Sequence, residues 1–462
     1  MHYLSPEFGI LFIVFLWLYW WLGNQFGNIA QNRLLLLASY GFYATFSWQF
    51  ALQLLGFSAV ILTLAQYCQP QRRWPMVLGI VLAVTNLGLF KYYNFFREDV
   101  FYWFSPLFQG ATLPVLELIL PIGISFYTFQ GLAYLINVGR GEFPAAGYAD
   151  GLLHLSFFPT LLAGPICRPQ ELLPQIQQPN PRVLKEAELA LILILSALIK
   201  KIWLAAWLAE SFVDPVFANP TAYQAVDLLC ALFAYAWQLF FDFSGYTDIV
   251  TAFALLLGFQ LPMNFNQPYL AKDLSDFWRR WHVTLSRWIR DYVYISFGGN
   301  RAGFAKTQLN LLAAMTISGL WHGASLTFVV WGIWHGLGLI GQNCWQRFSK
   351  IHFPALLTQL FTFLFVCFGW LLFRANDWET FASYCQGFLN WQQAPQLNWL
   401  LFLSAMTLFF IGAKQAENVM MKSLSSFKKL AWWAQSLVFT GLALAVLALA
   451  PAGMPGFIYF GF

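Results

Sequence analysis

Long apolar runs alternate with short polar connections along almost the whole chain. A helix needs about 20 apolar residues to cross a bilayer, and these runs are continuously apolar rather than alternating as barrel strands are. The run 309–340 is too long for one ordinary span. The pattern therefore predicts an all-α polytopic membrane protein with about 11–12 transmembrane helices. The runs stand near residues 8–22, 34–48, 50–67, 76–96, 113–138, 189–209, 228–258, 309–340, 355–373, 399–413 and 431–449.

One apolar segment, 152–164, is too short to cross a membrane. Its second half carries Pro159 and Gly164, followed by Pro165, and these residue types interrupt helices. Short apolar segments of this kind are often re-entrant. Irregular backbone at membrane depth is tolerated only where protein buries it or where it lines a wet cavity. We therefore expect a re-entrant segment that forms part of a cavity wall.

The composition supports the same class. Of the 462 residues, 59% are hydrophobic and 10% are charged, whereas soluble proteins carry about 25% charged residues. A soluble enzyme and a disordered chain are both excluded. The sequence shows no internal repeat, so we expect a single membrane domain over residues 1–462. The six cysteines form no CxxC pair and no metal-ligand pattern, and neither a disulfide framework nor a metal site is predicted.

The positive charge is concentrated in one polar stretch, residues 263–307. This stretch holds seven basic and three acidic side chains, a net charge of +4, and the whole chain has +5. The positive-inside rule places it in the cytoplasm. Both chain ends then lie outside, provided that the run 309–340 forms a hairpin. The modest overall charge does not suggest nucleic acid as a partner, and the apolar runs make membrane lipids the expected surroundings.

Within the basic stretch, apolar side chains recur every three or four residues, the spacing of one helix face. Ser275 is the expected N-cap of this amphipathic helix. A basic, tryptophan-rich amphipathic helix usually lies in the membrane interface. Its cations are alternatively suited to bind an anionic cytoplasmic ligand, and the two roles are compatible. The apolar face consists of Phe277, Trp281, Leu285, Trp288 and Tyr292.

Two histidines stand in the longest apolar run, each within a Trp-His-Gly sequence. His322 is the candidate for chemistry, because an ionisable group in such a run is costly and imidazole moves protons near neutral pH. The alternative role of His322 is a hydrogen bond between packed helices. His335 lies about 20 Å and about 140° further along one straight helix. The two cannot share a proton unless the chain turns between them, so a packing role is favoured for His335.

Other polar residues give weaker signals. His282, on the amphipathic helix, and His154, in the re-entrant segment, show no specific pattern on their own. Asp242 and Asp248 are the main carboxylates inside apolar runs. Hydrogen bonding to neighbouring helices is the favoured role for both, and a polar cavity is the alternative. The sequence contains no nucleophile elbow, HExxH motif, Walker loop or GxGxxG fingerprint.

Two longer motifs resemble a known family. They are NFNQPYLAKDLSDFWRRWHVTLSRWIRDYVYISFGGNR, at 264–301, and SGLWHGASLTFVVWGIWHG, at 318–336. Together they resemble the signature of the membrane-bound O-acyltransferase (MBOAT) family, and most of all its bacterial branch that acts in alginate O-acetylation. LPIGISFYTFQGLAYLINVGRG and FFPTLLAGPICRP resemble the same branch. The resemblance covers about residues 91–373 and implies the MBOAT fold.

The resemblance also implies roles for particular side chains. His322 matches the family's catalytic histidine, and His282 matches its second histidine. No metal and no bound cofactor are implied. Positions associated with substrate binding match Asn266, Trp278, Arg279 and Arg280.

The implied activity is O-acyl transfer from a cytoplasmic donor, acetyl-CoA. The acetyl group would cross the bacterial inner membrane, in which the chain is a multi-pass protein, and reach a periplasmic acetyltransferase partner. The final acceptor would be an extracytoplasmic polysaccharide, such as an alginate-like exopolysaccharide or peptidoglycan. Two alternatives stay open. One is an MBOAT that acylates a lipid or a protein directly, and the other is a transporter or flippase without covalent chemistry.

Overall fold

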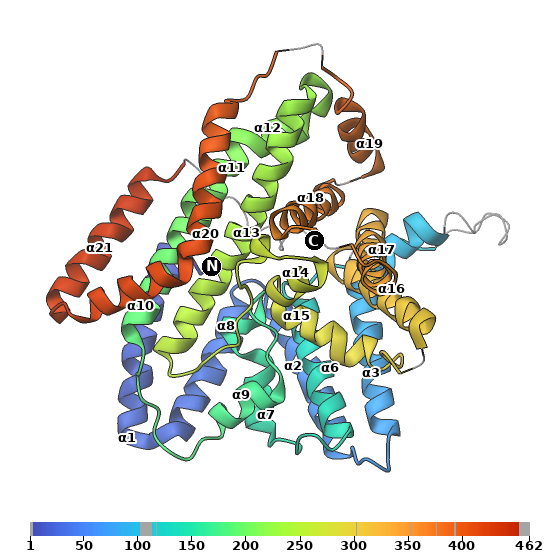
Figure 1. Cartoon of the computed structure of the whole chain (residues 1–462). Helices are drawn as coiled ribbons and strands as arrows, with labels where there is room; N and C mark the ends of the chain where they lie inside the picture. The colour runs from blue at the N-terminus through green and yellow to red at the C-terminus, as the bar shows by residue number, and fades with distance from the viewer. Residues whose placement is uncertain are drawn as a thin grey trace. The chain divides into compact units, whose positions relative to one another are not determined.

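The chain is helical throughout its described length. The computed structural model describes residues 3–101, 113–116, 118–301, 303–351, 353–375, 377–391 and 394–451. In these residues the regular structure consists of helices, with a lone antiparallel bridge between Gln69 and Arg72. The predicted all-α class is therefore confirmed (Figure 1).

The chain divides into two compact units, described separately below. We call them unit 1, which comprises Met1–Ile194 and Tyr246–Pro262, and unit 2, which comprises Leu195–Gly245 and Met263–Phe462. Two of the three unit boundaries fall within α10 (Ala187–Ala197) and α13 (Ala225–Leu256), and the third lies between Pro262 and Met263.

Eight described helices are long and apolar enough to cross a membrane, compared with the 11–12 spans predicted. The predicted run 8–22 and most of the run 34–48 fall within α1 (Pro6–Ala44), whose helical backbone is interrupted at Gly27. The run 309–340 divides into α16 (Gly303–His322) and α17 (Leu326–Phe348), so the expected turn within it is confirmed. The eight are Glu7–Ala44, Trp48–Gln66, Trp74–Glu98, Ala187–Ala218, Ala225–Leu256, Ala355–Arg374, Trp399–Phe427 and Trp432–Leu449.

Unit 1 contains the segment that we expected to be re-entrant. The segment forms two short helices, α7 (Tyr148–Ser156) and α8 (Phe158–Leu161), and residues 153–167 are all buried. Neither helix is long enough to cross a membrane. Protein covers the irregular backbone of the segment, as the bilayer interior requires. The other elements of unit 1 are α2 (Trp48–Gln66), α3 (Trp74–Leu87), η1 (Gly88–Tyr92), α4 (Tyr93–Phe95), η2 (Phe96–Phe101), α6 (Ile124–Gly139) and α9 (Pro169–Ile176).

Unit 2 contains both longer motifs. Before α16 its elements are η4 (Leu198–Ala205), α11 (Ala206–Leu208), η5 (Ala209–Val213), α12 (Asp214–Ala218), η6 (Pro220–Ala222), η7 (Pro268–Leu270), α14 (Leu274–Arg280), α15 (Val283–Trp288) and η8 (Ile289–Tyr294). After α17 they are α18 (Ala355–Arg374), α19 (Trp378–Gly387), α20 (Trp399–Lys428) and α21 (Trp432–Leu449).

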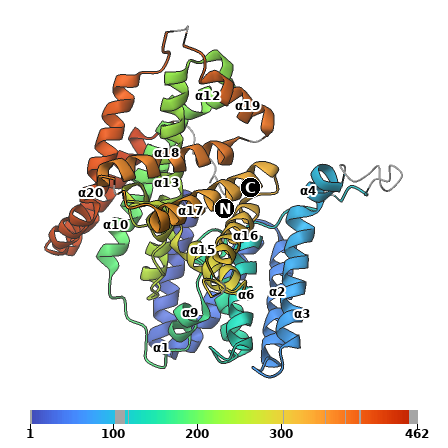
Figure 2. The same cartoon turned by 45° about the vertical axis from the view of Figure 1, so that its right-hand side comes forward.

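Helices α16 and α17 form a closely packed hairpin, and both views show them side by side (Figures 1 and 2). A Cβ atom at Gly319 would lie 2.2 Å from the carbonyl oxygen of Phe328. One at Gly332 would lie 2.4 Å from the carbonyl oxygen of Met315. The hairpin therefore needs glycine at both positions, because backbone cannot give way as a flexible side chain can.

The predicted amphipathic helix is interrupted at Trp281 and His282, between α14 and α15. His282 has left-handed backbone angles, φ 41° and ψ 55°. The predicted N-cap was also wrong. Asp273 caps α14, its Oδ1 accepting a hydrogen bond from the backbone N–H of Asp276 at 2.7 Å, whereas Ser275 lies inside the helix.

The aromatic face of this broken helix is covered by protein. Phe277 and Trp281 pack on Trp370 of α18, with ring centroids 6.4 and 4.8 Å apart. At Phe277 and Trp281, the face that an interfacial helix would present to lipid therefore packs on α18 of unit 2. All five predicted face residues are buried: Phe277, Trp281, Leu285, Trp288 and Tyr292.

Asp242 of α13 forms a buried ion pair with Lys201 of η4. Both residues belong to unit 2. A charge inside an apolar helix is normally paired in this way. The favoured role of Asp242, contact with a neighbouring helix, is confirmed.

Candidate active site

His322 is the last residue of α16, and aromatic rings surround its imidazole. The side chain is 3% exposed. The ring centroids of Trp321, Trp331 and Phe373 lie 4.9, 4.9 and 5.0 Å from the centroid of His322. These rings belong to α16, α17 and α18. His322 therefore stands where three helices meet, in surroundings that exclude bulk water.

The turn after His322 brings the second Trp-His-Gly motif alongside the first. Ser325 caps α17, its Oγ accepting a hydrogen bond from the backbone N–H of Thr327 at 3.3 Å. Trp331 then packs against His335, with centroids 4.7 Å apart, so that one indole contacts both imidazoles. His335 is fully buried, and neither of its ring nitrogens has a hydrogen-bond partner among the described residues. The chain turns between the two histidines, so the separation along one straight helix that favoured a packing role for His335 does not apply.

Asn264 fixes the orientation and the tautomer of His282. The Asn264 Oδ1 atom accepts hydrogen bonds from the Thr284 backbone N–H at 3.2 Å and from the Thr284 hydroxyl at 2.9 Å, and it lies 3.0 Å from His282 Nδ1. A backbone N–H can only donate, so the Asn264 atom is the amide oxygen. His282 Nδ1 must therefore carry the proton.

The other nitrogen of His282, Nε2, consequently holds the lone pair. It is buried, and it has no hydrogen-bond partner in the part of the chain that the structure describes. Burial lowers the pKa of His282 to about 3, because desolvation disfavours the charged imidazole. His282 is thus neutral at physiological pH and presents a hydrogen-bond acceptor.

Trp321 lies next to both predicted catalytic histidines. Its ring centroid is 5.9 Å from that of His282 and 4.9 Å from that of His322. Phe243 of α13 packs against His282 at 4.8 Å. The structure therefore gathers His282 and His322 into one aromatic cluster, although 40 positions separate them in the sequence.

A pocket of about 880 Å³ opens among α14, α15, η8, α16 and α17. No acidic side chain occurs among its described lining residues. Two of its arginines also pair with Asp276 or Asp291, and Arg347 stacks on the ring of Phe304 at 4.3 Å. Guanidinium groups hold phosphates through paired N–H donors, so the pocket suits a large phosphate-bearing ligand. Its arginines are Arg279, Arg287, Arg290 and Arg347.

One face of α16 leads from this pocket to His322. His322 follows Ser318 by four residues, one helical turn and about 6 Å along the same face. From the opposite wall, Trp278 lines the pocket and packs on Trp331, with centroids 5.7 Å apart. His322 itself does not line the pocket, but it lies one turn beyond Ser318 on the same face of α16. The pocket-lining residues on this face of α16 are Leu311, Ala314, Met315 and Ser318.

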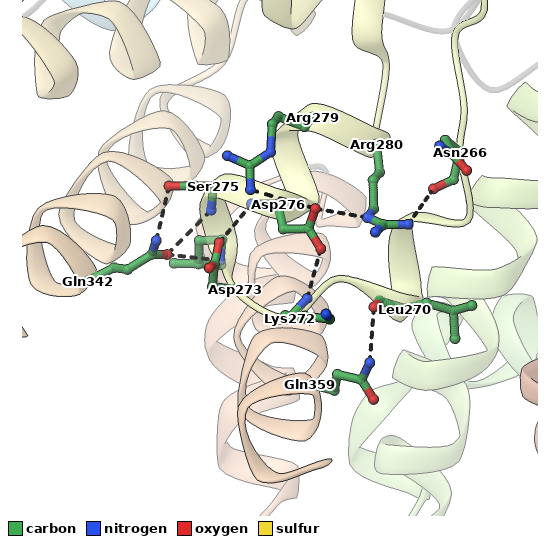
Figure 3. A network of polar contacts seen from close by, with 11 residues as sticks. Asn266, Leu270, Lys272, Asp273, Ser275, Asp276, Arg279, Arg280, Gln342 and Gln359 are labelled. Carbon is green, nitrogen blue, oxygen red and sulfur yellow. Dashed lines mark hydrogen bonds and ion pairs between the residues drawn. The ribbon is translucent and has the colours of Figure 1, made fainter. Parts of the chain in front are cut away.

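The other two predicted binding residues, Asn266 and Arg280, are joined by hydrogen bonds (Figure 3). Arg280 Nη1 donates a hydrogen bond to the carbonyl oxygen of Asn266 at 3.3 Å, and the Asn266 backbone N–H donates to the carbonyl oxygen of Arg280 at 2.9 Å. Arg280 also pairs with Asp276 at 3.0 Å. Trp278 and Arg279 line the pocket, whereas Asn266 and Arg280 do not.

Helix α17 fixes the start of α14 (Figure 3). Gln342 Oε1 accepts hydrogen bonds from the backbone N–H groups of Leu274 at 2.9 Å and Ser275 at 3.3 Å. Gln342 Nε2 donates to the Ser275 hydroxyl at 3.0 Å. These bonds satisfy N–H groups that a helix start leaves free. They hold one wall of the pocket against another.

Sequence reasoning missed several residues of this site. Asn264 begins the first motif, but it lies in irregular backbone before α14, so no single helix or strand relates it to His282. Arg347 lies outside the basic stretch 263–307, at the end of α17. The frequent Trp and Phe residues of the motifs were the available signal for the aromatic cluster.

The arrangement suits proton and group transfer. It places two imidazoles in a dry aromatic cluster beside a cationic pocket, where a proton can be taken from a hydroxyl group while an anionic ligand is held. Across the described ranges, no group of three or more His, Cys, Asp or Glu is placed to hold a metal ion.

Comparison with known proteins identifies the family. The membrane-bound O-acyltransferase (MBOAT) family matches residues 115–376, which include both motifs and the pocket. The chain is 37% identical to the "Probable alginate O-acetylase AlgI" of Pseudomonas aeruginosa, over 90% of this chain and 82% of that protein. It is 34% identical to the "Peptidoglycan O-acetyltransferase" of Helicobacter pylori, over 77% of this chain and 73% of that protein.

The name of a more distant relative refers to another polymer. The chain is 28% identical to the "Teichoic acid D-alanyltransferase" of Bacillus subtilis, over 59% of this chain and 76% of that protein. The relatives thus share acyl transfer and differ in the acyl group and the acceptor that their names state. The chain belongs to the MBOAT family and is a multi-pass membrane O-acyltransferase.

Proposed function

We propose that this acyltransferase takes an acetyl group from cytoplasmic acetyl-CoA and passes it across the inner membrane for O-acetylation of an extracytoplasmic polysaccharide. The names of the relatives at 37% and 34% identity, an alginate O-acetylase and a peptidoglycan O-acetyltransferase, support acetyl as the group and a polysaccharide as the acceptor. An alginate-like exopolysaccharide or peptidoglycan fits this description.

The observation that carries the proposal is the continuous α16 face between the arginine-lined pocket and His322. Coenzyme A carries phosphates at one end and the thioester at the other. The arginines bind the phosphates, and the thioester extends along the α16 face, past Ser318, to His322. The net charge of +4 in residues 263–307 supports entry of the donor from the cytoplasm.

At His322 the reaction is an acyl transfer from sulfur to oxygen. The acceptor hydroxyl oxygen attacks the thioester carbonyl carbon while His322 takes the hydroxyl proton as general base. The C–O bond forms and the C–S bond breaks. The departing thiolate receives the proton from His322, so that coenzyme A leaves as a free thiol and the imidazole returns to its neutral form.

His282 has a different role from His322 in this scheme. Its lone pair on Nε2 and its low pKa suit it to accept a hydrogen bond rather than to carry a proton through the reaction. We assign it to orienting a hydroxyl or amide donor of a substrate near His322. Asn264 keeps the lone pair on the nitrogen that faces away from the Asn264 amide.

The acceptor hydroxyl belongs to a periplasmic acetyltransferase, which then acetylates the polysaccharide. Passing the acetyl group alone through the membrane protein avoids moving the charged coenzyme across the bilayer. The alternative is direct acylation of a lipid or a protein, which requires a long-chain donor and no periplasmic partner.

Everted membrane vesicles, which expose the cytoplasmic face, distinguish these activities. Vesicles that contain the protein receive radiolabelled acetyl-CoA or palmitoyl-CoA, and label transfer is compared with that in vesicles that contain His322→Ala. We expect acetyl transfer that depends on His322 and little palmitoyl transfer. Transfer from palmitoyl-CoA without transfer from acetyl-CoA would reject the acetyl donor and favour direct lipid or protein acylation.

A further inference from the structure

The rings around His322 leave little room for an acyl chain. Trp331 and Phe373 each approach the imidazole to about 5 Å between centroids, and they also pack on each other at 5.7 Å. Phe328 packs on Phe373 from the other side at 5.0 Å. All three of these side chains are buried. These rings therefore contact the imidazole or one another, and protein covers them.

We propose that Phe373 restricts the transferred group to acetyl by closing the space beside His322. The proposal rests on the proposed function, because it takes His322 as the site of acyl transfer. A thioester that arrives past Ser318 places its carbonyl carbon beside the imidazole, against which the Phe373 ring packs. An acetyl group ends there, whereas each further methylene must displace a packed ring. Such overpacking of a dense interior is unfavourable.

Phe373 can be tested by truncation. It lies near the end of α18, and its ring approaches the cluster from outside the α16–α17 hairpin. Trp331 lies inside that hairpin and contacts both His322 and His335. Truncating Phe373 therefore opens space beside His322 while the packing between α16 and α17 is retained.

The control is Phe368→Ala. Phe368 belongs to the same helix, and its ring contacts Trp334 at 4.7 Å and Phe381 at 6.2 Å. Phe368→Ala removes the same atoms from α18 as Phe373→Ala does, away from the rings that contact His322. A change caused by a looser α18 alone would appear in both variants.

The experiment measures release of the coenzyme A thiol in everted vesicles supplied with acetyl-, butyryl- or hexanoyl-CoA, after subtraction of the release in His322→Ala vesicles. One methylene in an apolar pocket changes kcat/KM by about 10- to 200-fold. We expect Phe373→Ala to raise the butyryl-to-acetyl ratio of kcat/KM at least about tenfold. Phe373→Leu should raise it less, and Phe368→Ala should leave it unchanged.

Each result decides a separate point. Wild-type release from acetyl-CoA together with an unchanged ratio in Phe373→Ala overturns the chain-length proposal and leaves the proposed function intact. Absence of wild-type release above His322→Ala overturns both. If Phe373→Ala does not accumulate in the membrane, the ratio in Phe373→Leu decides, because leucine retains much of the apolar volume.

Discussion

The imidazole of His322 packs against the indole of Trp331 with ring centroids 4.9 Å apart, although one helix ends and another begins between them. The same indole packs against His335 at 4.7 Å. The turn between α16 and α17 thus joins two motifs that a straight helix would hold apart. The surroundings of His322 therefore depend on how closely these two helices pack.

Gly319→Ala should loosen this hairpin. Its Cβ would lie 2.2 Å from the carbonyl oxygen of Phe328, so we expect a loss of about 1–3 kcal/mol in the free energy of unfolding. Thermal unfolding in detergent measures the change. The control is Gly341→Ala in α17, where nothing lies within 4 Å of the new Cβ. That variant should be as stable as the wild type or more stable, because alanine favours helix by about 1 kcal/mol over glycine. Equal stabilities of the two variants would contradict the close packing.

Asn264→Ala should impair the function of His282 while the imidazole itself is retained. The imidazole then loses the bond that holds the proton on Nδ1, and we expect acetyl transfer in everted vesicles to fall about tenfold, the effect of one lost buried hydrogen bond. His282→Gln should show at least the same loss. If Asn264 acts through His282, the double variant loses no more than His282→Gln alone. If the double variant instead loses the sum of the two single losses, Asn264 does not act through His282.

Acid should destabilise the folded protein through His282. Burial lowers its pKa from 6.5 to about 3, so between these values the unfolded chain binds a proton that the folded chain does not. Stability falls as the pH drops below about 6.5 and is independent of this group above it. At about 1.4 kcal/mol per pH unit, the step from pH 6.5 to pH 5 costs about 2 kcal/mol.

His282→Gln removes this titration. Thermal unfolding at pH 7.5 and at pH 5 should therefore show a smaller acid-induced loss of stability in the variant than in the wild type, by about 2 kcal/mol. The comparison isolates His282 because every other titratable group is retained. An identical loss in both proteins would show that His282 is protonated equally in the folded and unfolded states.

Arg347→Gln should weaken donor binding. A charged hydrogen bond to phosphate contributes about 1.5–3 kcal/mol, so we expect the KM for acetyl-CoA to rise at least about tenfold with a smaller change in kcat. Arg301→Gln is the matched control, because Arg301 belongs to the basic stretch but does not line the pocket. A KM that rises in the Arg301 variant and not in the Arg347 variant would place the donor elsewhere.

Much of the fold could be predicted because it depends on hydrophobicity. The apolar runs gave the helical membrane class, and Pro159 with Gly164 marked the broken segment that forms α7 and α8. The length of the run 309–340 indicated the hairpin. His322 could be singled out because an ionisable group in an apolar helix is costly wherever the helix packs.

The site geometry could not be predicted, because it depends on contacts between distant segments. The helical periodicity continued through His282, and the interruption arises where Asn264 binds the Thr284 N–H and the imidazole. Asp273 rather than Ser275 caps α14, while the Ser275 N–H and hydroxyl bind Gln342 of α17. Such bonds leave no periodic signal in the sequence.

The most direct test of the central claim measures base-labile acetate on the envelope polysaccharides of cells that have the protein, lack it or carry His322→Ala. The predicted result is that the deletion and the substitution lose acetate from the same polymer, while the variant accumulates in the membrane at the wild-type level. Full acetylation in cells that carry His322→Ala would contradict the assignment of His322 as the catalytic base.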